Sequence, residues 1–353
     1  MTPLAAFAPI KCAASDTRFD QPQDGVVVEH GTGREGDLVL VEALASSGAY
    51  RDVENLDGRS MRIHAGQRFI AVLGYRESSQ CLVGGVPEEG VDTRAAPLHL
   101  LTNGGIVGTC RCSPGYMGPP LPLACLGLLC RDGRTINAAD RVDRWCPELT
   151  SSAPIVLVAA TAAEAGKTTV SARIISGLTR RHGMRVAGTK LAGTGCLEDV
   201  LQQLDAGAQS VLDFPDVGLP STYTAPERYV PAIRTLLERL NESAPDVIVG
   251  ELGGDFIWAN IPTLLQTPDV MRHVVGLTLL PLDVVAGIGA IRLLEDWAVS
   301  VPVHIVIPHL RNPEAARLRI RRFMGREAYD VTSEADVEAF VDVLAGAVRH
   351  RRA

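Results

Sequence analysis

The chain has 353 residues, of which 46% are hydrophobic and 21% are charged, and its formal net charge is −7. This is the composition of a globular protein with room for two domains, and the acidic balance argues against general binding to nucleic acids or anionic membranes. No apolar run is long enough to cross a bilayer, and no basic segment precedes the short apolar stretch near the N-terminus, so we expect a cytoplasmic protein without a signal peptide, nucleic-acid partner or membrane contact.

The first part of the chain predicts short strands separated by turns. Its apolar runs end at glycines or polar turns, and helical periodicity is weak. The expected strands are residues 25–30, 36–44, 68–74, 104–110 and 123–130. This pattern favours a small mainly-β domain, either a barrel or a sandwich, over residues 1–150.

The eight cysteines are scattered and form no Cys-x-x-Cys pair. Cys110 and Cys112 lie two residues apart, with Cys125 and Cys130 downstream, and thiolates are good ligands for soft metals. Because this spacing matches no recurrent zinc pattern, we interpret the cysteines as free thiols of a reducing cytoplasm. A metal cluster around Cys110 and Cys112 is the alternative.

After the polar stretch 147–153, strand-like runs alternate with helical ones. Such alternation predicts a parallel sheet with helices on both faces, and thus an α/β domain over residues 151–353. The expected strands are residues 154–160, 185–190, 246–252, 274–280 and 303–308. Ligands bind beyond the carboxyl ends of such strands, where every motif below lies. The basic residues 349–353 are interpreted as a solvated tail.

The run ATAAEAGKT, residues 160–168, follows the first of these strands and precedes a helical pattern. It fits the phosphate-loop pattern G-x-x-x-x-G-K-[ST] at Gly166, Lys167 and Thr168, whereas Thr161 replaces the first glycine. Loops of this type present backbone N–H groups to phosphate oxygens. We expect Lys167 to bridge the terminal phosphates and the Thr168 hydroxyl to bind Mg²⁺. The other loop residues expected at the phosphates are Thr161, Glu164, Ala165 and Thr169.

Two further strand ends carry the charges that such a site needs. Glu251 ends the run DVIVGEL before a Gly-Gly turn, and a carboxylate beside a triphosphate is a natural Mg²⁺ ligand. Lys190 ends the strand after the loop helix, and consecutive strands are mostly neighbours in a sheet. We therefore expect Lys190 beside the phosphate loop, acting with Lys167 in catalysis and contacting the substrate. A surface lysine is the alternative.

Together these blocks resemble dethiobiotin synthetases. ATAAEAGKT is similar to their loop G-T-D-x-x-V-G-K-T, TKLAGTG to their turn K-P-V-A-S-G, and GELGGDF to their segment E-G-A-G-G, in the same order. The likeness covers roughly residues 154–310. It extends to the wider P-loop class that includes the cobyrinic-acid amidating synthetases and the metal-chaperone GTPases. The resemblance implies the use of ATP and Mg²⁺, and a homodimer.

Departures from the synthetase pattern leave parts of the site open. Ala162 stands where the synthetases have a metal-binding aspartate, so a further acid is needed to bind the metal. The resemblance leaves Asp199 and Asp205 as alternatives for this role. Each of them could instead be a surface acid. Asn312, or His309, stands where an asparagine reads adenine in the synthetases. The sequence has no N-K-x-D motif, which argues against a guanine-reading GTPase, although GTP stays open.

The run DFPDVGLPSTY, residues 213–223, is rich in Pro, Gly and hydroxyl groups, as loops that contact substrates often are. Ser221 and Thr222 are candidate substrate contacts. Alternatively, they only form turns and cap the next helix. The longer run 205–222 resembles a family of bacterial P-loop proteins that includes D-glutamate N-acyltransferases and that also joins a small N-terminal domain to such a loop.

These motifs predict an enzyme of kinase or ligase type that uses ATP and Mg²⁺ to phosphorylate or activate a small carboxylate-bearing metabolite. One alternative is an N-acyltransferase whose loop binds the phosphates of an acyl-CoA. A second alternative is a nucleotide-gated metal chaperone or switch, which would need a metal-ligand cluster.

Overall fold

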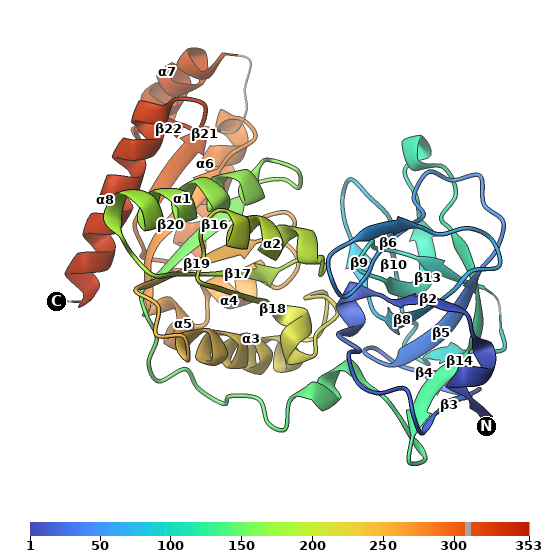
Figure 1. Cartoon of the computed structure of the whole chain (residues 1–353). Coiled ribbons are helices and arrows are strands. Elements are labelled where there is room, and N and C mark those ends of the chain that lie inside the picture. The colour runs from blue at the N-terminus through green and yellow to red at the C-terminus, as the bar shows by residue number, and fades with distance from the viewer. Residues whose placement is uncertain (96, 308–311, 353) are drawn as a thin grey trace. The chain divides into compact units, whose positions relative to one another are not determined.

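The protein divides into two compact units, each described here by itself (Figure 1). The computed structural model describes residues 1–95, 97–307 and 312–352. The N-terminal unit comprises Met1–Arg144, Thr194–Glu198 and Phe214–Thr224. The C-terminal unit comprises Trp145–Gly193, Asp199–Asp213 and Ala225–Ala353.

The N-terminal unit is built mainly from strands, as the sequence predicts. Five of its strands pair in a closed cycle, from β14 through β5, β8, β13 and β12 back to β14, and so form a small barrel. These strands are β5 Leu38–Ala43, β8 Arg68–Leu73, β12 Leu98–Leu100, β13 Ile106–Cys112 and β14 Pro122–Arg131.

Shorter elements surround this barrel. The remaining strands are β1 Thr2–Pro3, β2 Ile10–Ala13, β3 Val26–Glu29, β4 Thr32–Gly33, β6 Asp52–Glu54, β7 Ser60–Arg62, β9 Arg76–Glu77, β10 Val83–Gly85, β11 Val91–Asp92 and β15 Arg134–Thr135. Short 3-10 helices are Leu4–Phe7, Ser15–Thr17, Gly115–Met117, Ala138–Arg141 and Phe214–Val217.

Both faces of the barrel sheet are buried. On β5, Val39 and Val41 pack in one apolar cluster, whereas Leu38 and Leu40 pack in a second cluster with Ile70. Successive side chains of a strand point to opposite faces. The sequence of a strand that is buried on both faces is therefore a continuous apolar run, and this explains why polar and apolar residues do not alternate along β5.

The C-terminal unit is an α/β domain with a seven-stranded parallel sheet in the order β18-β17-β19-β16-β20-β21-β22, which confirms the predicted fold class. Its strands are β16 Ile155–Ala160, β17 Val186–Ala192, β18 Ser210–Asp213, β19 Val247–Leu252, β20 Val274–Leu280, β21 Val303–Ile307 and β22 Ala328–Asp330. Its helices are α1 Lys167–His182, α2 Leu197–Asp205, α3 Pro226–Asn241, α4 Ile261–Leu265, α5 Pro268–Met271, α6 Val284–Asp296, α7 Pro313–Met324 and α8 Glu334–Arg352, except that Leu197 and Glu198 of α2 belong to the N-terminal unit.

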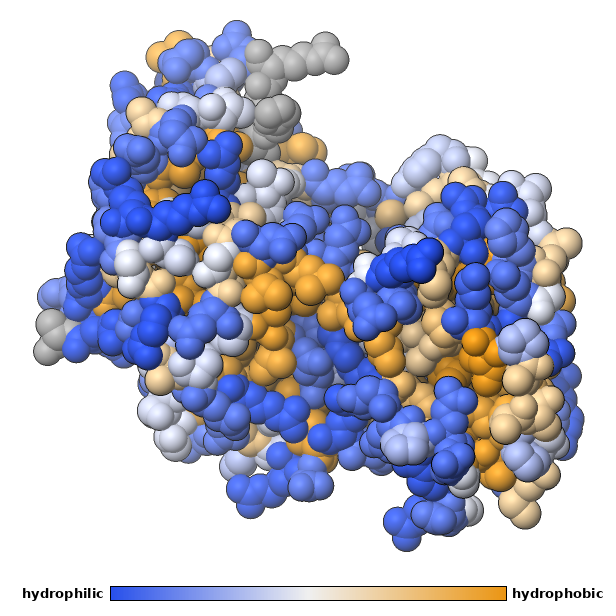
Figure 2. All heavy atoms as spheres, viewed as in Figure 1, coloured by the Kyte–Doolittle hydropathy of each residue, from blue (hydrophilic) through white to orange (hydrophobic). Residues whose placement is uncertain are grey.

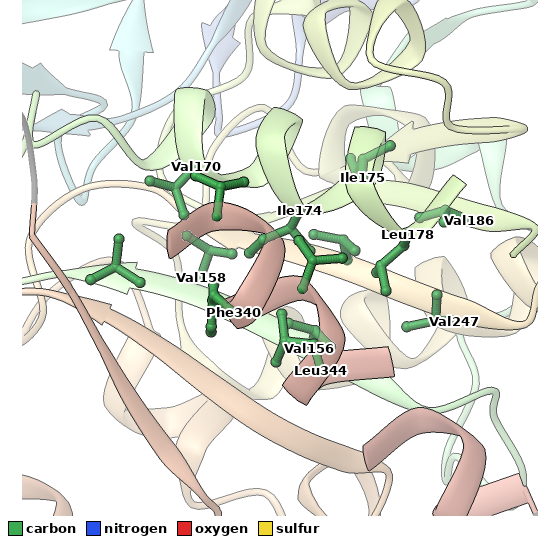
Figure 3. Close-up of a cluster of buried hydrophobic side chains, with 14 of the residues drawn as sticks. Val156, Val158, Val170, Ile174, Ile175, Leu178, Val186, Val247, Phe340 and Leu344 are labelled. Carbon is green, nitrogen blue, oxygen red and sulfur yellow. The ribbon is translucent and has the colours of Figure 1, made fainter. Parts of the chain in front are cut away.

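Helices α1 and α8 pack together on one face of this sheet (Figure 3). Ile174 and Leu178 of α1 lie one helical turn apart, as do Phe340 and Leu344 of α8, and all four are buried in the same cluster as Val156 of β16. Hydrophilic side chains predominate on the surface formed by these two helices (Figure 2). No helix among the described residues is both long and apolar enough to cross a membrane.

The basic residues 349–352 form the last turn of α8 and are exposed. Arg352 Nη1 lies 2.6 Å from Asp246 Oδ1, and Arg351 donates a hydrogen bond to the Arg272 carbonyl oxygen. Basic side chains in the last turn also interact favourably with the helix dipole. These contacts join residues distant in sequence, so the local pattern did not reveal them.

The packing of α8 on the sheet predicts a large cost for truncating Leu344, which is fully buried. Leu344→Ala should lower the free energy of unfolding by about 2–5 kcal/mol, because it removes apolar contacts and leaves a cavity. Val343→Ala is the matched control, since Val343 is 44% exposed. Urea unfolding followed by circular dichroism measures both, and equal effects of the two changes would contradict the packing.

Candidate functional site

The phosphate loop connects β16 to α1, as predicted, and its first residue is anchored to the neighbouring strand. The Thr161 N–H donates to the Leu280 carbonyl oxygen at 3.1 Å, and Thr161 Oγ1 accepts from the Leu282 N–H at 2.9 Å. Threonine therefore replaces the usual glycine with a residue that pins the loop to the end of β20.

The loop ends in backbone conformations that leave the start of α1 open. Glu164 has φ 57° and Gly166 has φ 89°, both left-handed, and a Cβ added to Gly166 would meet nothing within 4 Å. Gly166 is the N-cap of α1 and provides no side-chain cap. The first N–H groups of this 16-residue helix thus lack a capping partner, which is the arrangement that binds anions. Ala165 is buried, whereas Thr169 is exposed on the first turn.

Lys167 is buried and held by two carbonyl groups. Its Nζ donates to the Ala162 oxygen at 3.1 Å and to the Gly254 oxygen at 2.9 Å, and only 6% of the residue is exposed. Burial lowers the pKa of Lys167, and the negative charge of Glu251 partly offsets this lowering. The Gly254 carbonyl, a partner that the sequence did not suggest, ties the ammonium to the turn after β19.

Glu251 lies on β19, directly beside the loop strand β16. Thr168 Oγ1 donates to Glu251 Oε1 at 3.2 Å, whereas Glu251 Oε2 is buried and has no hydrogen-bond partner among the described residues. Burial, and after it the Asp199 carboxylate, raises the pKa of Glu251 to about 7. A buried carboxylate oxygen without a partner is costly unless a ligand satisfies it.

Lys190 lies close to these groups, although by a different route from the one expected. Its strand β17 pairs with β18 and β19 and not with β16, because β19 lies between the two strands. The expectation that consecutive strands are neighbours is therefore wrong here. Lys190 is instead the register partner of Glu251 on β19, and it forms an ion pair with Asp199.

The two alternative acids after β17 lie in different surroundings. Asp199, in the first turns of α2, contacts Lys190 and acts electrostatically on Glu251. Asp205 is the exposed last residue of that helix. The geometry brings Asp199, and not Asp205, to the cluster around Glu251.

The turn after β19 approaches the end of β17 so closely that it requires glycine. A Cβ on Gly253 would lie 2.5 Å from the Ala192 carbonyl oxygen and 2.8 Å from Lys190 Cε. Real side chains do not tolerate the first of these distances. The Gly-Gly dipeptide thus serves to bring β17 and β19 together at their carboxyl ends.

The chain contains only three lysines among its 34 basic residues. Two of them, Lys167 and Lys190, are 6% and 7% exposed and lie in this cluster. Lysine presents a compact point charge on a flexible stem, whereas arginine presents a planar fork. The chain thus uses lysine at the two buried positions of this cluster, the start of α1 and the end of β17, and arginine almost everywhere else.

A separate apolar cavity of about 420 Å³ lies beyond the ends of β20 and β21. It is connected to the phosphate loop through Leu282, whose N–H donates to Thr161. The apolar residues that line it are Pro281, Leu282, Val284, Val285, Ile307, Ala316 and Ile320.

The other predicted site residues have varied surroundings. Ser221 and Thr222 are fully buried in the N-terminal unit, where Ser221 pairs by its backbone with Thr194. Asn312 caps α7, since its Oδ1 accepts from the Ala315 N–H at 3.0 Å. His309 lies outside the described residues.

The cysteines are free thiols. Cys110 Sγ donates to the Cys112 carbonyl oxygen at 3.4 Å, and burial raises the pKa of Cys110. The described part of the chain has no group of three or more His, Cys, Asp or Glu side chains placed to hold a metal ion.

No protein-family model and no curated protein sequence matches the chain. Among solved structures, a ParA family ATPase from Chlorobium tepidum is 14% identical over 56% of this chain and 92% of its own, with a TM-score of 0.34. A duf1611 family protein from Anabaena variabilis is 16% identical over 61% and 64%, with a TM-score of 0.40. Chloroplast FtsY from Physcomitrella patens is 14% identical over 60% and 70%, with a TM-score of 0.35.

The burial of Glu251 predicts a pH dependence of stability. Its folded-state pKa of about 7 exceeds the unfolded value of 4.5, so its contribution to stability is fully present below the unfolded pKa and is lost as the pH rises through the folded pKa. The free energy of unfolding of the metal-free protein should fall on the order of 2–3 kcal/mol from about pH 5 to about pH 8.

Glu251→Gln should remove this fall, because an amide does not ionise. Asp205→Asn, which changes an exposed acid, should keep it. Urea unfolding at a series of pH values, with a chelator present, measures the slope. A wild-type slope in Glu251→Gln would show that another group is responsible.

Proposed function

We propose that the C-terminal unit binds a nucleoside triphosphate with Mg²⁺ and transfers or uses its terminal phosphoryl group to activate a small carboxylate-bearing metabolite. The observation that carries the proposal is the pairing of Thr168 and Glu251 at 3.2 Å beside the uncapped start of α1. A hydroxyl, a carboxylate and a phosphate-binding helix end at one place form the arrangement of a P-loop nucleotide site.

The phosphates would lie against the first N–H groups of α1, with Lys167 beside them. Lys167 Nζ is now held by the Ala162 and Gly254 carbonyl oxygens. A phosphate oxygen is a stronger acceptor for an ammonium group, since it carries charge. The two carbonyls therefore hold Lys167 at the loop and leave its charge for the ligand.

The donor set at Glu251 fits Mg²⁺, which binds oxygen ligands and usually keeps several waters. Thr168 Oγ1 and the unpartnered Glu251 Oε2 would hold the ion, and Asp199 would add negative charge nearby. Mg²⁺, when bound, would neutralise charge on the phosphates and orient them.

The apolar cavity beside Leu282 offers a place for the base. It lies next to the phosphate loop and has room, at about 420 Å³, for a planar ring system. The sequence lacks an N-K-x-D motif, so we favour ATP over GTP. Asn312 follows β21, whose Ile307 lines this cavity, and it remains our proposed adenine contact.

Lys190 would stabilise charge that develops on the reacting groups. Its ammonium is buried and paired with Asp199, so it is positioned before the reaction, and electrostatic groups of this kind contribute most when they are held in place. The resemblance to the synthetases supports a carboxylate substrate. An acyltransferase that binds acyl-CoA phosphates with the same loop would need neither Mg²⁺ nor hydrolysis.

Lys167→Ala should abolish nucleotide binding, because it removes the cation at the terminal phosphates. Isothermal titration with ATP, GTP and an acyl-CoA, each with and without Mg²⁺, measures the loss. Lys11→Ala is the matched control, since Lys11 is the chain's exposed lysine. Wild-type protein that binds only the acyl-CoA, independently of Mg²⁺, would favour the acyltransferase. Undiminished ATP binding in folded Lys167→Ala would refute the proposed site.

Lys190→Ala should change turnover far more than nucleotide affinity. The ATP dissociation constant should stay within a few-fold, whereas turnover with the carboxylate substrate should fall by roughly a hundredfold or more, because a charge that acts in the transition state is lost. ADP release in the presence of candidate carboxylates, paired with ATP titrations, gives both values. Full turnover would place Lys190 outside the reaction.

A further inference from the structure

The N-terminal unit contains a half-buried arginine that faces no acid. Arg76 lies on β9, and no carboxylate among the described residues pairs with it. By contrast, Arg68 has Glu42 at 2.8 Å and Arg18 has Asp216 at 2.8 Å. Charges that are removed from water are usually paired, so an unmatched cation at such a position indicates a missing anion.

Neutral groups hold the Arg76 guanidinium in place. Its Nη1 donates to Tyr50 Oη at 3.0 Å and to the Leu101 carbonyl oxygen, and Cζ lies 5.4 Å from the centre of the Tyr50 ring. Tyr50 Oη also accepts from the Asn103 N–H at 3.0 Å. Burial raises the pKa of Tyr50, so near pH 7 its phenol is neutral and supplies no countercharge.

The opposite edge of the guanidinium has no hydrogen-bond acceptor among the described residues. Nε is buried without a hydrogen-bond partner, and Nη2 likewise has no acceptor within the described ranges, because both hydrogen bonds of Arg76 come from Nη1. An unsatisfied buried donor is costly. Together Nε and Nη2 form the planar fork that binds both oxygens of a carboxylate.

The surroundings favour a singly charged ligand. Tyr223 and Cys81 lie close enough to act electrostatically on Arg76. Tyr223 belongs to the segment Phe214–Thr224, in which Ser221 has a buried hydroxyl without a partner among the described residues. One fixed cation beside the neutral phenol of Tyr50 matches a carboxylate better than a phosphate dianion, which would call for more positive charge.

We infer that Arg76 anchors a binding site for small carboxylates in the N-terminal unit. The inference goes beyond the proposed function, because it stands on residues of the N-terminal unit alone and needs neither a nucleotide nor the phosphate loop. Tyr50 and the Leu101 carbonyl position the guanidinium, and its Nε–Nη2 edge binds the ligand.

The test is titration calorimetry of the full chain with succinate, and separately with inorganic phosphate, in the absence of nucleotide. Wild-type protein should bind succinate more tightly than phosphate. Arg76→Gln should weaken succinate binding by at least about tenfold, the scale of one lost charged contact. Arg76→Lys keeps the charge but lacks the fork, so it should also bind succinate more weakly than the wild type.

Arg62→Gln is the matched control, because Arg62 lies in the same unit and is already paired with Asp52 at 2.8 Å. It should keep wild-type succinate affinity. No succinate binding by the wild type, tighter binding of phosphate, or unchanged affinity in both Arg76 variants would overturn the inference. Lys167→Ala should still bind succinate, so a failed nucleotide titration contradicts the proposed function only, and a failed succinate titration contradicts only this site.

Discussion

The candidate site depends on the burial of opposite charges at the carboxyl end of β19. Glu251 has Val158 of β16 as its register partner on one side and Lys190 of β17 on the other. Any one of these charges alone would be costly to remove from water, but carboxylates and ammonium groups placed together offset that cost. The cluster is still incomplete, because Glu251 Oε2 has no partner among the described residues.

The same strand ends explain why the loop tolerates an unusual sequence. Thr161 loses the freedom of glycine but gains one side-chain hydrogen bond, from the Leu282 N–H just after β20, in addition to the backbone hydrogen bond to Leu280 that glycine could also form. Strain remains at Glu164, whose left-handed conformation helps to turn the chain into α1, whereas Gly166 adopts such a conformation without strain. Backbone strain that persists at a helix start with no cap is typical of ligand-binding loops.

The N-terminal unit follows a different physical scheme, in which long-range contacts hold segments from distant parts of the chain. Glu54 accepts hydrogen bonds from the Leu197 and Glu198 N–H groups at 2.7 and 3.0 Å. A carboxylate at the start of a helix stabilises both its free N–H groups and its dipole. The segment Thr194–Glu198 thus belongs to this unit although it follows β17 directly in sequence.

The sequence by itself determined the features that depend on local pattern. Continuous apolar runs indicated β5, β16 and β19, and Gly166-Lys167-Thr168 indicated the loop, because these signals lie within a few residues. Only the tertiary structure placed β19 between β16 and β17, selected Asp199 over Asp205 as the neighbour of Lys190, and left Arg76 without an acid. Strand order and charge pairing are decided by contacts between residues far apart in the chain, and such contacts leave no periodic signal in one sequence.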